Sequence, residues 1–263
     1  RIILSGLFVF AEVWNSAPLQ ADYTWFTIGE KTFSIGVLLN NLTVLMQFIV
    51  CIIALPVHIY SKSYMKGDAG LHRYWMYLSL FCFAMLGLTI SKNLLVMYIF
   101  WELVGFASYL LIGFWFTKES AVQANKKAFL INRIGDLGFL IGLAILFSTF
   151  GTLDLVEILG KDGLFFQGII DYNSGLITTA GICFFLGAMA KSAQFPLHLW
   201  LPDAMEGPTS VSSLIHAATM VAAGVFLLSS IFPLFNGTVL LIITIIGTIT
   251  AITSAIFALA QYD

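Results

Sequence analysis

The stretch AKSAQFPLHLWLPDAMEGPTSVSSLIHAATMVAAGVFLL, residues 190–228, decides the fold. Lys191 ends one apolar run, three prolines follow, and a second apolar run begins near residue 210. Proline removes a backbone donor and clashes with the preceding turn, so it interrupts a helix. We therefore predict a discontinuous helix near 192–208, a feature that lies at ion sites in transporters. The alternative is an ordinary proline kink that leads into an interfacial loop.

Outside this stretch the chain is also strongly apolar. Of its 263 residues 59% are hydrophobic and 10% are charged, against about 25% charged in soluble domains. The apolar runs are continuous, whereas barrel strands would alternate, and most are long enough to cross a bilayer as helices. We therefore predict an all-α polytopic transmembrane helix bundle, a single transmembrane domain over 1–263. The predicted spans are 36–60, 74–90, 93–116, 123–148, 176–192, 210–232 and 238–260, with the tail of a span at 1–13 and loops at 14–35 and 149–175.

The connecting segments alternate in charge. If the chain crosses at every span, the basic residues gather on one side and most acidic residues on the other, which includes the loop 149–175. Basic loops face the cytoplasm, or the matrix of an organelle. We expect an integral protein of a bacterial inner membrane, with an organelle inner membrane as the alternative. The basic residues are Lys62, Lys66, Arg73, Lys118, Lys126 and Lys127.

The lipid bilayer is one expected partner, and the small net charge of −2 gives no reason to expect nucleic acid. The chain begins with Arg1 rather than Met and stops at Asp263, directly after an apolar run. We therefore expect the N-terminal portion of a longer chain. The sequence has no Walker A, GxGxxG or CxxC motif, and its three cysteines fall inside apolar runs. We expect no cofactor and no metal on this chain.

Two charged residues within apolar runs are candidates for proton transfer. Each charged residue at the centre of a membrane helix costs about 2.5–3.5 kcal/mol, so such residues are functional candidates. Glu102 lies inside the span 93–116, with Gly105 on its face. Lys191 is its natural counter-ion, because lysine, unlike arginine, releases its proton readily when it is buried. The alternatives are a protonated Glu102 bonded to backbone and a Lys191 that extends to the interface.

Three further residues complete the candidate site. His216 lies on an apolar helix with hydroxyl side chains on its face, and histidine exchanges protons near neutral pH. It is a third candidate for proton transfer, although a lone histidine is often a core residue. Arg133 and Asp136 are three residues apart, the spacing of an ion pair along one helix. A structural ion pair is the first interpretation, and coupling between charges is the second.

These motifs resemble the antiporter-like subunits of respiratory complex I. The resemblance covers FWELVGFASYLLIGFWF (100–116), NRIGDLGFL (132–140) and the long stretch 190–228. It is to subunit L, which is named chain 5 in mitochondria, and to its plastid counterpart. The resemblance implies two inverted five-helix repeats, of which 74–232 would be the first. It also pairs Glu102 with Lys191 and makes His216 a relay.

The resemblance implies a proton-translocating membrane subunit of NADH:quinone oxidoreductase, an enzyme complex. NADH, flavin, iron–sulfur clusters and quinone would then belong to the other subunits, and other membrane subunits of complex I are the expected partners. In the expected mechanism the Glu102–Lys191 pair separates, and the proton of Lys191 passes to His216. The alternative is the large subunit of an Mrp-type sodium/proton antiporter. That relative usually has a lysine where Ala222 stands and lacks the aspartate at 136, so both positions favour complex I.

Overall fold

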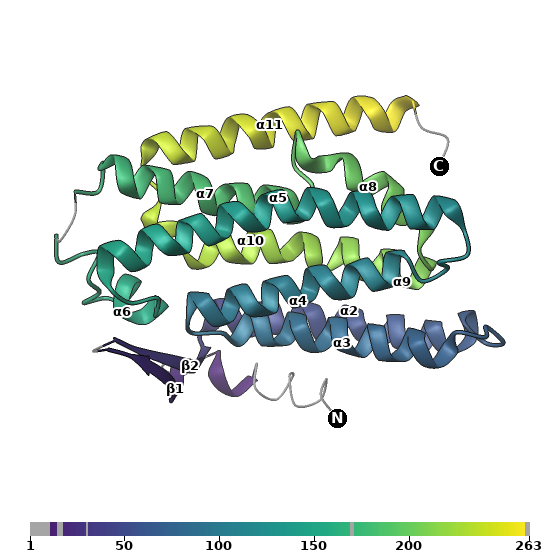
Figure 1. Cartoon of the computed structure of the whole chain (residues 1–263), viewed down its shortest axis with the longest axis horizontal. Helices are drawn as coiled ribbons and strands as arrows, with labels where there is room; N and C mark the ends of the chain where they lie inside the picture. Colours follow the sequence, from purple (N-terminus) through teal and green to yellow (C-terminus); the bar gives the residue numbers. More distant parts are fainter. Residues whose placement is uncertain (1–10, 15–17, 30, 169–170, 261–263) are drawn as a thin grey trace.

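The computed structural model describes residues 11–14, 18–29, 31–168 and 171–260. Long helices lie side by side, and a short helix and a β-hairpin lie together at one end of the bundle, which we call the outer end (Figure 1). The helices are α2 (Asn41–Tyr64), α3 (Leu71–Ile90), α4 (Leu94–Ile112), α5 (Glu119–Phe150), α6 (Leu155–Leu159), α7 (Gly175–Lys191), α8 (Trp200–Asp203), α9 (Thr209–Ala217), α10 (Met220–Ser230) and α11 (Gly237–Ala260).

Six helical segments within the described ranges are long and apolar enough to cross a membrane, when α9 and α10 are counted as one. The prediction of a transmembrane helix bundle is therefore confirmed. Each of the six begins and ends near the predicted residues, because the apolar runs themselves set the limits. The predicted span 176–192 corresponds to α7, which is apolar but shorter than these six. The predicted tail of a span at 1–13 lies mostly outside the described residues.

The N-terminal segment contains an antiparallel hairpin, so the prediction of a loop at 14–35 was wrong. Strands β1 (Leu19–Ile28) and β2 (Lys31–Leu39) replace the predicted loop at 14–35 and the first turn of the predicted span at 36–60. Gly29, with a φ of 61°, lies in the turn, a conformation that costs glycine little. Threonine, aromatic and β-branched residues fill both strands, as pleated sheets favour. Phe33 stacks on Phe147 and thereby attaches the hairpin to α5.

Lys92 fixes the hairpin to the outer end of the bundle. It lies between α3 and α4, is 7% exposed, and its ammonium is 2.6 Å from Asp22 of β1 and 3.2 Å from Asp154. Burial disfavours the ammonium form, but the hydrogen bonds to Asp22 and Asp154 outweigh burial and raise the pKa of Lys92. The backbone of Lys92 also donates to Gly36 and accepts from Leu155. One residue thus joins the hairpin, the α3–α4 connection and α6.

The predicted discontinuity near 192–208 is present. Helix α7 ends at Lys191, and two 3₁₀ turns, η1 (Leu197–Leu199) and η2 (Ala204–Glu206), flank the short α8 before α9 begins. The freed backbone groups bond within the protein: Phe195 donates to the Thr250 hydroxyl, and the Trp200 indole donates to the carbonyl of Ala190 at 2.9 Å. Such internal bonding is what allows irregular backbone at membrane depth.

A second discontinuity interrupts the predicted span 210–232. Helix α9 ends at Ala217 and α10 begins at Met220, with Thr219 at φ −121° and ψ −89° between them. The hydroxyl of Thr219 donates to the Leu214 carbonyl at 2.7 Å and satisfies one acceptor at the end of α9. No proline marks this position. Along the chain, Lys191 directly precedes the first break and His216 lies just before the second.

Helices α5 and α7 pack against each other at backbone distance. A side chain at Gly135 would collide with Ala190, and a Cβ at Gly138 would lie 3.0 Å from the carbonyl oxygen of Cys183. Small residues at such positions allow close approach of membrane helices. This contact brings α5, which carries Arg133 and Asp136, against the helix that ends at Lys191.

Candidate functional site

Lys191 is fully buried at the end of α7. Its side chain is 0% exposed, so the alternative in which it extends to the interface is wrong. A Cβ on Gly105 of α4 would lie 2.5 Å from the ammonium nitrogen. Glycine at position 105 therefore leaves the space that the ammonium fills. The nitrogen also lies 5.6 Å from the centre of the Trp101 ring, in the geometry of a cation–π contact.

Asp136 of α5 is the carboxylate that faces Lys191. The Lys191 nitrogen is 4.0 Å from Oδ1 of Asp136, an ion pair without a hydrogen bond. The same Oδ1 accepts a 2.7 Å hydrogen bond from the Trp101 indole. Arg133 lies one turn away with a nitrogen 3.7 Å from Oδ2 of Asp136, so the predicted i, i+3 pair is present. Asp136 is thus shared among two cations and one indole.

Glu102 pairs with Arg133 and not with Lys191, so the expected Glu102–Lys191 pair is corrected. The reason is the rotation of α4 about its axis. Trp101 and Gly105 are four residues apart and share the face of α4 toward Lys191. Glu102, one residue after Trp101, lies about 100° further around the helix. Glu102 consequently faces Arg133, whose guanidinium also lies over the Phe129 ring at 4.6 Å. The four charged residues form one series: Glu102, Arg133, Asp136 and Lys191.

His216 lies beside this series but in none of its ion pairs. Its ring faces that of Trp200 with 6.4 Å between the ring centres. Trp200 is itself bonded to the backbone of Ala190, the residue before Lys191. The predicted site residues therefore form two groups. Four charged residues are joined by ion pairs, and His216 contacts Trp200, which in turn bonds to the end of α7.

Several buried polar atoms near the series have no hydrogen-bond partner among the described residues. Buried polar groups normally bond to protein or to ordered water. Because no described side chain supplies the partner, these atoms can accept or donate bonds to water. The atoms are the Lys191 nitrogen, Oδ2 of Asp136, Oδ1 of Asn132, Nδ1 of His198 and both ring nitrogens of His216.

Sequence reasoning did not identify Trp101 and Trp200 as parts of the site. Both are 0% exposed, and a buried indole N–H needs an acceptor. The sequence could have indicated both residues, because Trp101 directly precedes Glu102 and Trp200 lies within the stretch 190–228. The acceptor itself, a carboxylate for Trp101 and a backbone carbonyl for Trp200, depends on contacts between distant segments.

The arrangement can hold charge inside a membrane and rearrange it. Arginine stays protonated in proteins, so Arg133 is a fixed charge between two carboxylates. Lysine can release its proton when its counter-charge withdraws. The Asp136 carboxylate lies 3.7 Å from Arg133 and 4.0 Å from Lys191, so a small side-chain movement brings it nearer to one cation or the other. The arrangement is therefore chemically suited to proton transfer controlled by neighbouring charge.

The sequence matches two described families. The family "NADH:quinone oxidoreductase/Mrp antiporter, TM" matches residues 91–263, and "NADH-Ubiquinone oxidoreductase (complex I), chain 5 N-terminus" matches residues 25–75. The first match covers all four charged residues of the series. The chain belongs to the NADH:quinone oxidoreductase/Mrp antiporter membrane family. This family membership agrees with the resemblance seen in the sequence motifs, and the protein is an integral membrane protein.

Curated relatives in the family come from plastids and cyanobacteria. The chain is 48% identical to "NAD(P)H-quinone oxidoreductase subunit 5, chloroplastic" of Marchantia polymorpha, over 100% of this chain and 38% of the relative. It is 45% identical to "NAD(P)H-quinone oxidoreductase chain 5" of Synechocystis sp., over 100% of this chain and 39% of the relative. The chain thus spans about two fifths of the length of these relatives.

Two solved structures share the fold of this family member. The Mrp complex from Dietzia sp. DQ12-45-1b superposes with a TM-score of 0.75 at 28% identity, over 86% of this chain and 24% of that chain. An archaeal respiratory membrane complex, the membrane-bound sulfane sulfur reductase, superposes with a TM-score of 0.72 at 19% identity, over 89% of this chain and 46% of that chain. The second likeness concerns the fold alone.

Proposed function

We propose that this chain is the N-terminal part of a proton-translocating membrane subunit of NADH:quinone oxidoreductase. The single observation that carries the proposal is the series of ion pairs Glu102, Arg133, Asp136 and Lys191. Asp136 and Lys191 are buried, and the ammonium of Lys191 has no hydrogen-bond partner among the described residues. Nucleotide, flavin, iron–sulfur clusters and quinone are bound by other subunits of the complex. Its other membrane subunits are the partners, and residues 74–232 form the first antiporter-like repeat.

The mechanism that the geometry supports differs from the one expected from sequence. Asp136, not Glu102, holds Lys191 in its charged form. When a change elsewhere in the complex draws the negative charge of Asp136 toward Arg133, the Lys191 ammonium loses its counter-ion in a medium of low dielectric. The neutral amine is then favoured, and the proton leaves. Return of the Asp136 charge draws another proton onto Lys191.

Water and His216 complete the transfer path in this proposal. The atoms that lack a protein partner lie at Lys191, Asp136 and His216, so ordered water can link them. His216 can take the proton because a ring nitrogen exchanges protons near neutral pH. Trp200 holds the two groups in position, since it bonds to the end of α7 and faces the His216 ring.

The experiment uses the full-length protein in its membrane complex. Inverted membrane vesicles carry Lys191→Met, which keeps the side-chain volume and removes the charge. We expect acidification driven by NADH or NADPH to fall to background while the complex still assembles. Lys66→Met, an exposed lysine at the opposite, inner end, is the control and should acidify normally. Unchanged acidification by the Lys191 variant would refute the role of this lysine.

An Mrp-type sodium/proton antiporter subunit is the second candidate. The likeness to the Dietzia Mrp complex, at a TM-score of 0.75, supports it. The two functions differ in their energy source. If a sodium gradient, and neither NADH nor NADPH, drives proton movement that depends on Lys191, the antiporter function is correct.

A further inference from the structure

A cavity of about 600 Å³ lies at the outer end of the bundle, away from the charged series. This volume is within the range of sites that enclose small organic ligands, about 300–1,000 Å³. The cavity lies between the start of α2, the first turn of α4, the end of α10 and the segment around α6. These helix ends mark the boundary at which the spans leave the membrane, so the cavity lies at the level of lipid headgroups. Its walls are mostly apolar and include Leu38, Leu42, Met97, Leu155 and Phe226.

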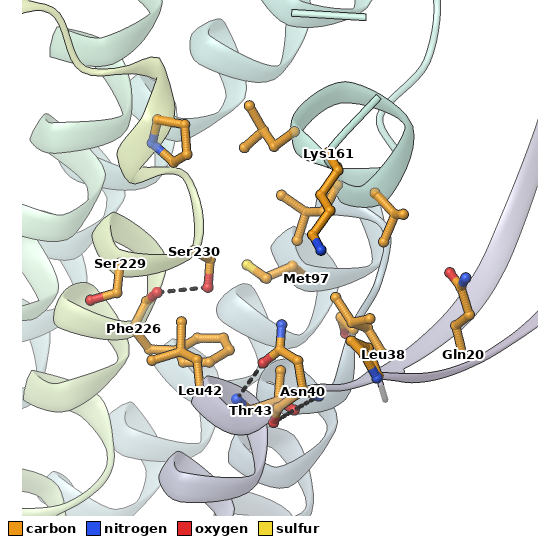
Figure 2. A pocket seen from close by; sticks show the side chains of 17 residues that line it. Gln20, Leu38, Asn40, Leu42, Thr43, Met97, Lys161, Phe226, Ser229 and Ser230 are labelled. Atoms are coloured by element: carbon orange, nitrogen blue, oxygen red, sulfur yellow. Dashed lines mark hydrogen bonds between the residues drawn. The ribbon is translucent and has the colours of Figure 1, made fainter. Parts of the chain in front are cut away.

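Two hydrogen-bond donors from separate segments point into this cavity. Figure 2 shows the ammonium of Lys161 and the amide nitrogen of Asn40 directed toward the same space beside Met97. Ser230 also lines the cavity, but its hydroxyl donates to the Phe226 carbonyl at 2.8 Å. The side-chain oxygen of Asn40 accepts from the backbone of Thr43, which leaves its amide nitrogen as the free donor. Lys161 takes part in no ion pair among the described residues.

The cavity has a net positive charge. Among the described residues, no carboxylate lines it. The nearby acidic residues are engaged elsewhere: Asp22 and Asp154 both bind Lys92, and Glu157 accepts from the Thr152 hydroxyl. A cation with one neutral donor, the Asn40 amide, suits the oxygens of a phosphate group, whereas a cationic or zwitterionic ligand would place positive charge near Lys161.

We propose that this cavity binds the phosphate headgroup of an anionic membrane phospholipid. Lys161 and Asn40 contact the phosphate oxygens, and the glycerol and the first acyl carbons lie on the apolar walls. A free phosphate ion would use the same two donors but would leave those walls in contact with water, and this favours the lipid. The site is independent of the proposed proton path.

Photo-crosslinking in the membrane complex that contains the full-length chain tests this proposal. The probe is a phosphatidylglycerol with a diazirine near the glycerol end of its acyl chain, and labelled peptides are identified by mass spectrometry. We expect labelling of the segments 38–43, 155–161 and 226–233 in the wild-type protein. Lys161→Gln should reduce that labelling about fivefold, the effect of losing one lysine near an anionic lipid. Ser230→Leu, which fills the cavity, should reduce it as well.

Competition and a matched variant decide the outcome. Unlabelled phosphatidylglycerol should displace the probe, whereas phosphatidylcholine and inorganic phosphate should not. Lys66→Gln removes the same charge at the inner end and should leave labelling unchanged. Equal displacement by phosphatidylcholine would refute an anionic headgroup site, and displacement by inorganic phosphate would refute the lipid. Labelling that is unaltered in both Lys161→Gln and Ser230→Leu would show that the cavity is not the site.

Discussion

Two lysines within the described ranges are buried, and their surroundings differ. Lys92, at the outer end, is 7% exposed and has two carboxylates at 2.6 and 3.2 Å. Lys191, inside the bundle, is 0% exposed and has one carboxylate at 4.0 Å and no hydrogen bond among the described residues. The first ammonium is satisfied and therefore fixed. The second is held by its ion pair and by the Trp101 ring, and in the proposed mechanism it loses its proton. Burial by itself therefore does not separate the two kinds of lysine that we propose.

The largest expected difference is in stability. Lys92→Met leaves Asp154 buried without its cation and should lower the free energy of unfolding by about 3 kcal/mol. Lys191→Met removes a buried charge that makes no hydrogen bond, while Asp136 keeps Trp101 and Arg133. The free energy of unfolding of the Lys191→Met variant should therefore change by less than about 1 kcal/mol. Thermal unfolding of the full-length protein in detergent measures both, and equal losses would contradict the distinction.

Trp101→Phe sharpens the description of the inner site. The substitution removes the 2.7 Å hydrogen bond to Asp136, and bonds to charged groups contribute about 1.5–3 kcal/mol. We expect a loss of about 2 kcal/mol in the same unfolding assay. Trp115→Phe is the matched control, because its 3.2 Å bond to Asp68 lies in a less buried place. A larger loss for Trp115→Phe would show that the indole does not support Asp136.

Gly105→Ala tests the space around the ammonium without altering any charge. The new methyl group would lie 2.5 Å from the Lys191 nitrogen, and the flexible lysine chain would have to move. An overpacking cost of about 1 kcal/mol corresponds to about a fivefold loss of proton transfer. Gly247→Ala in α11, where nothing lies within 4 Å, is the control. Vesicle acidification distinguishes the two variants. Equal rates of acidification for Gly105→Ala and Gly247→Ala would show that the ammonium of Lys191 does not need the space at position 105.

The smallest effect concerns pH. Because its carboxylates raise the pKa of Lys92 in the folded protein, the stability that this lysine contributes is fully present below the ordinary lysine pKa of 10.5. It is lost as the pH rises through the raised value. The difference in stability between the wild type and Lys92→Met should therefore be constant from about pH 6 to about pH 9 and shrink above 10.5. Unfolding measured across this range would contradict the ion-pair account if the difference fell near neutral pH.

The length of each apolar run made the spans predictable, and the break after Lys191 was predictable from its prolines. The break at Thr219 has no such local sign and depends on packing around α9. The hairpin was missed because the acidic residues of 14–35 suggested a loop, although threonines and aromatic residues already favoured strands.

The members of the charged series were predictable, but one of their pairings was not. A charge within an apolar run identifies Glu102, Arg133, Asp136 and Lys191 from sequence alone. Which carboxylate faces Lys191 depends on how α4 is rotated about its axis, and that rotation is set by packing against other helices, chiefly α3 and α5. Spacing along a single helix found the Arg133–Asp136 pair, because that pair needs no tertiary information.

The close contact of α5 and α7 also bears on how fast the site rearranges. Backbone lies against backbone at Gly135 and Gly138, so neither helix can slide without a collision. The backbones that carry Asp136 and Lys191 are consequently held at a constant separation, and the distance between their charges changes through side-chain torsions. In the proposed mechanism the two charges therefore separate without the microsecond-to-millisecond displacement of a whole helix.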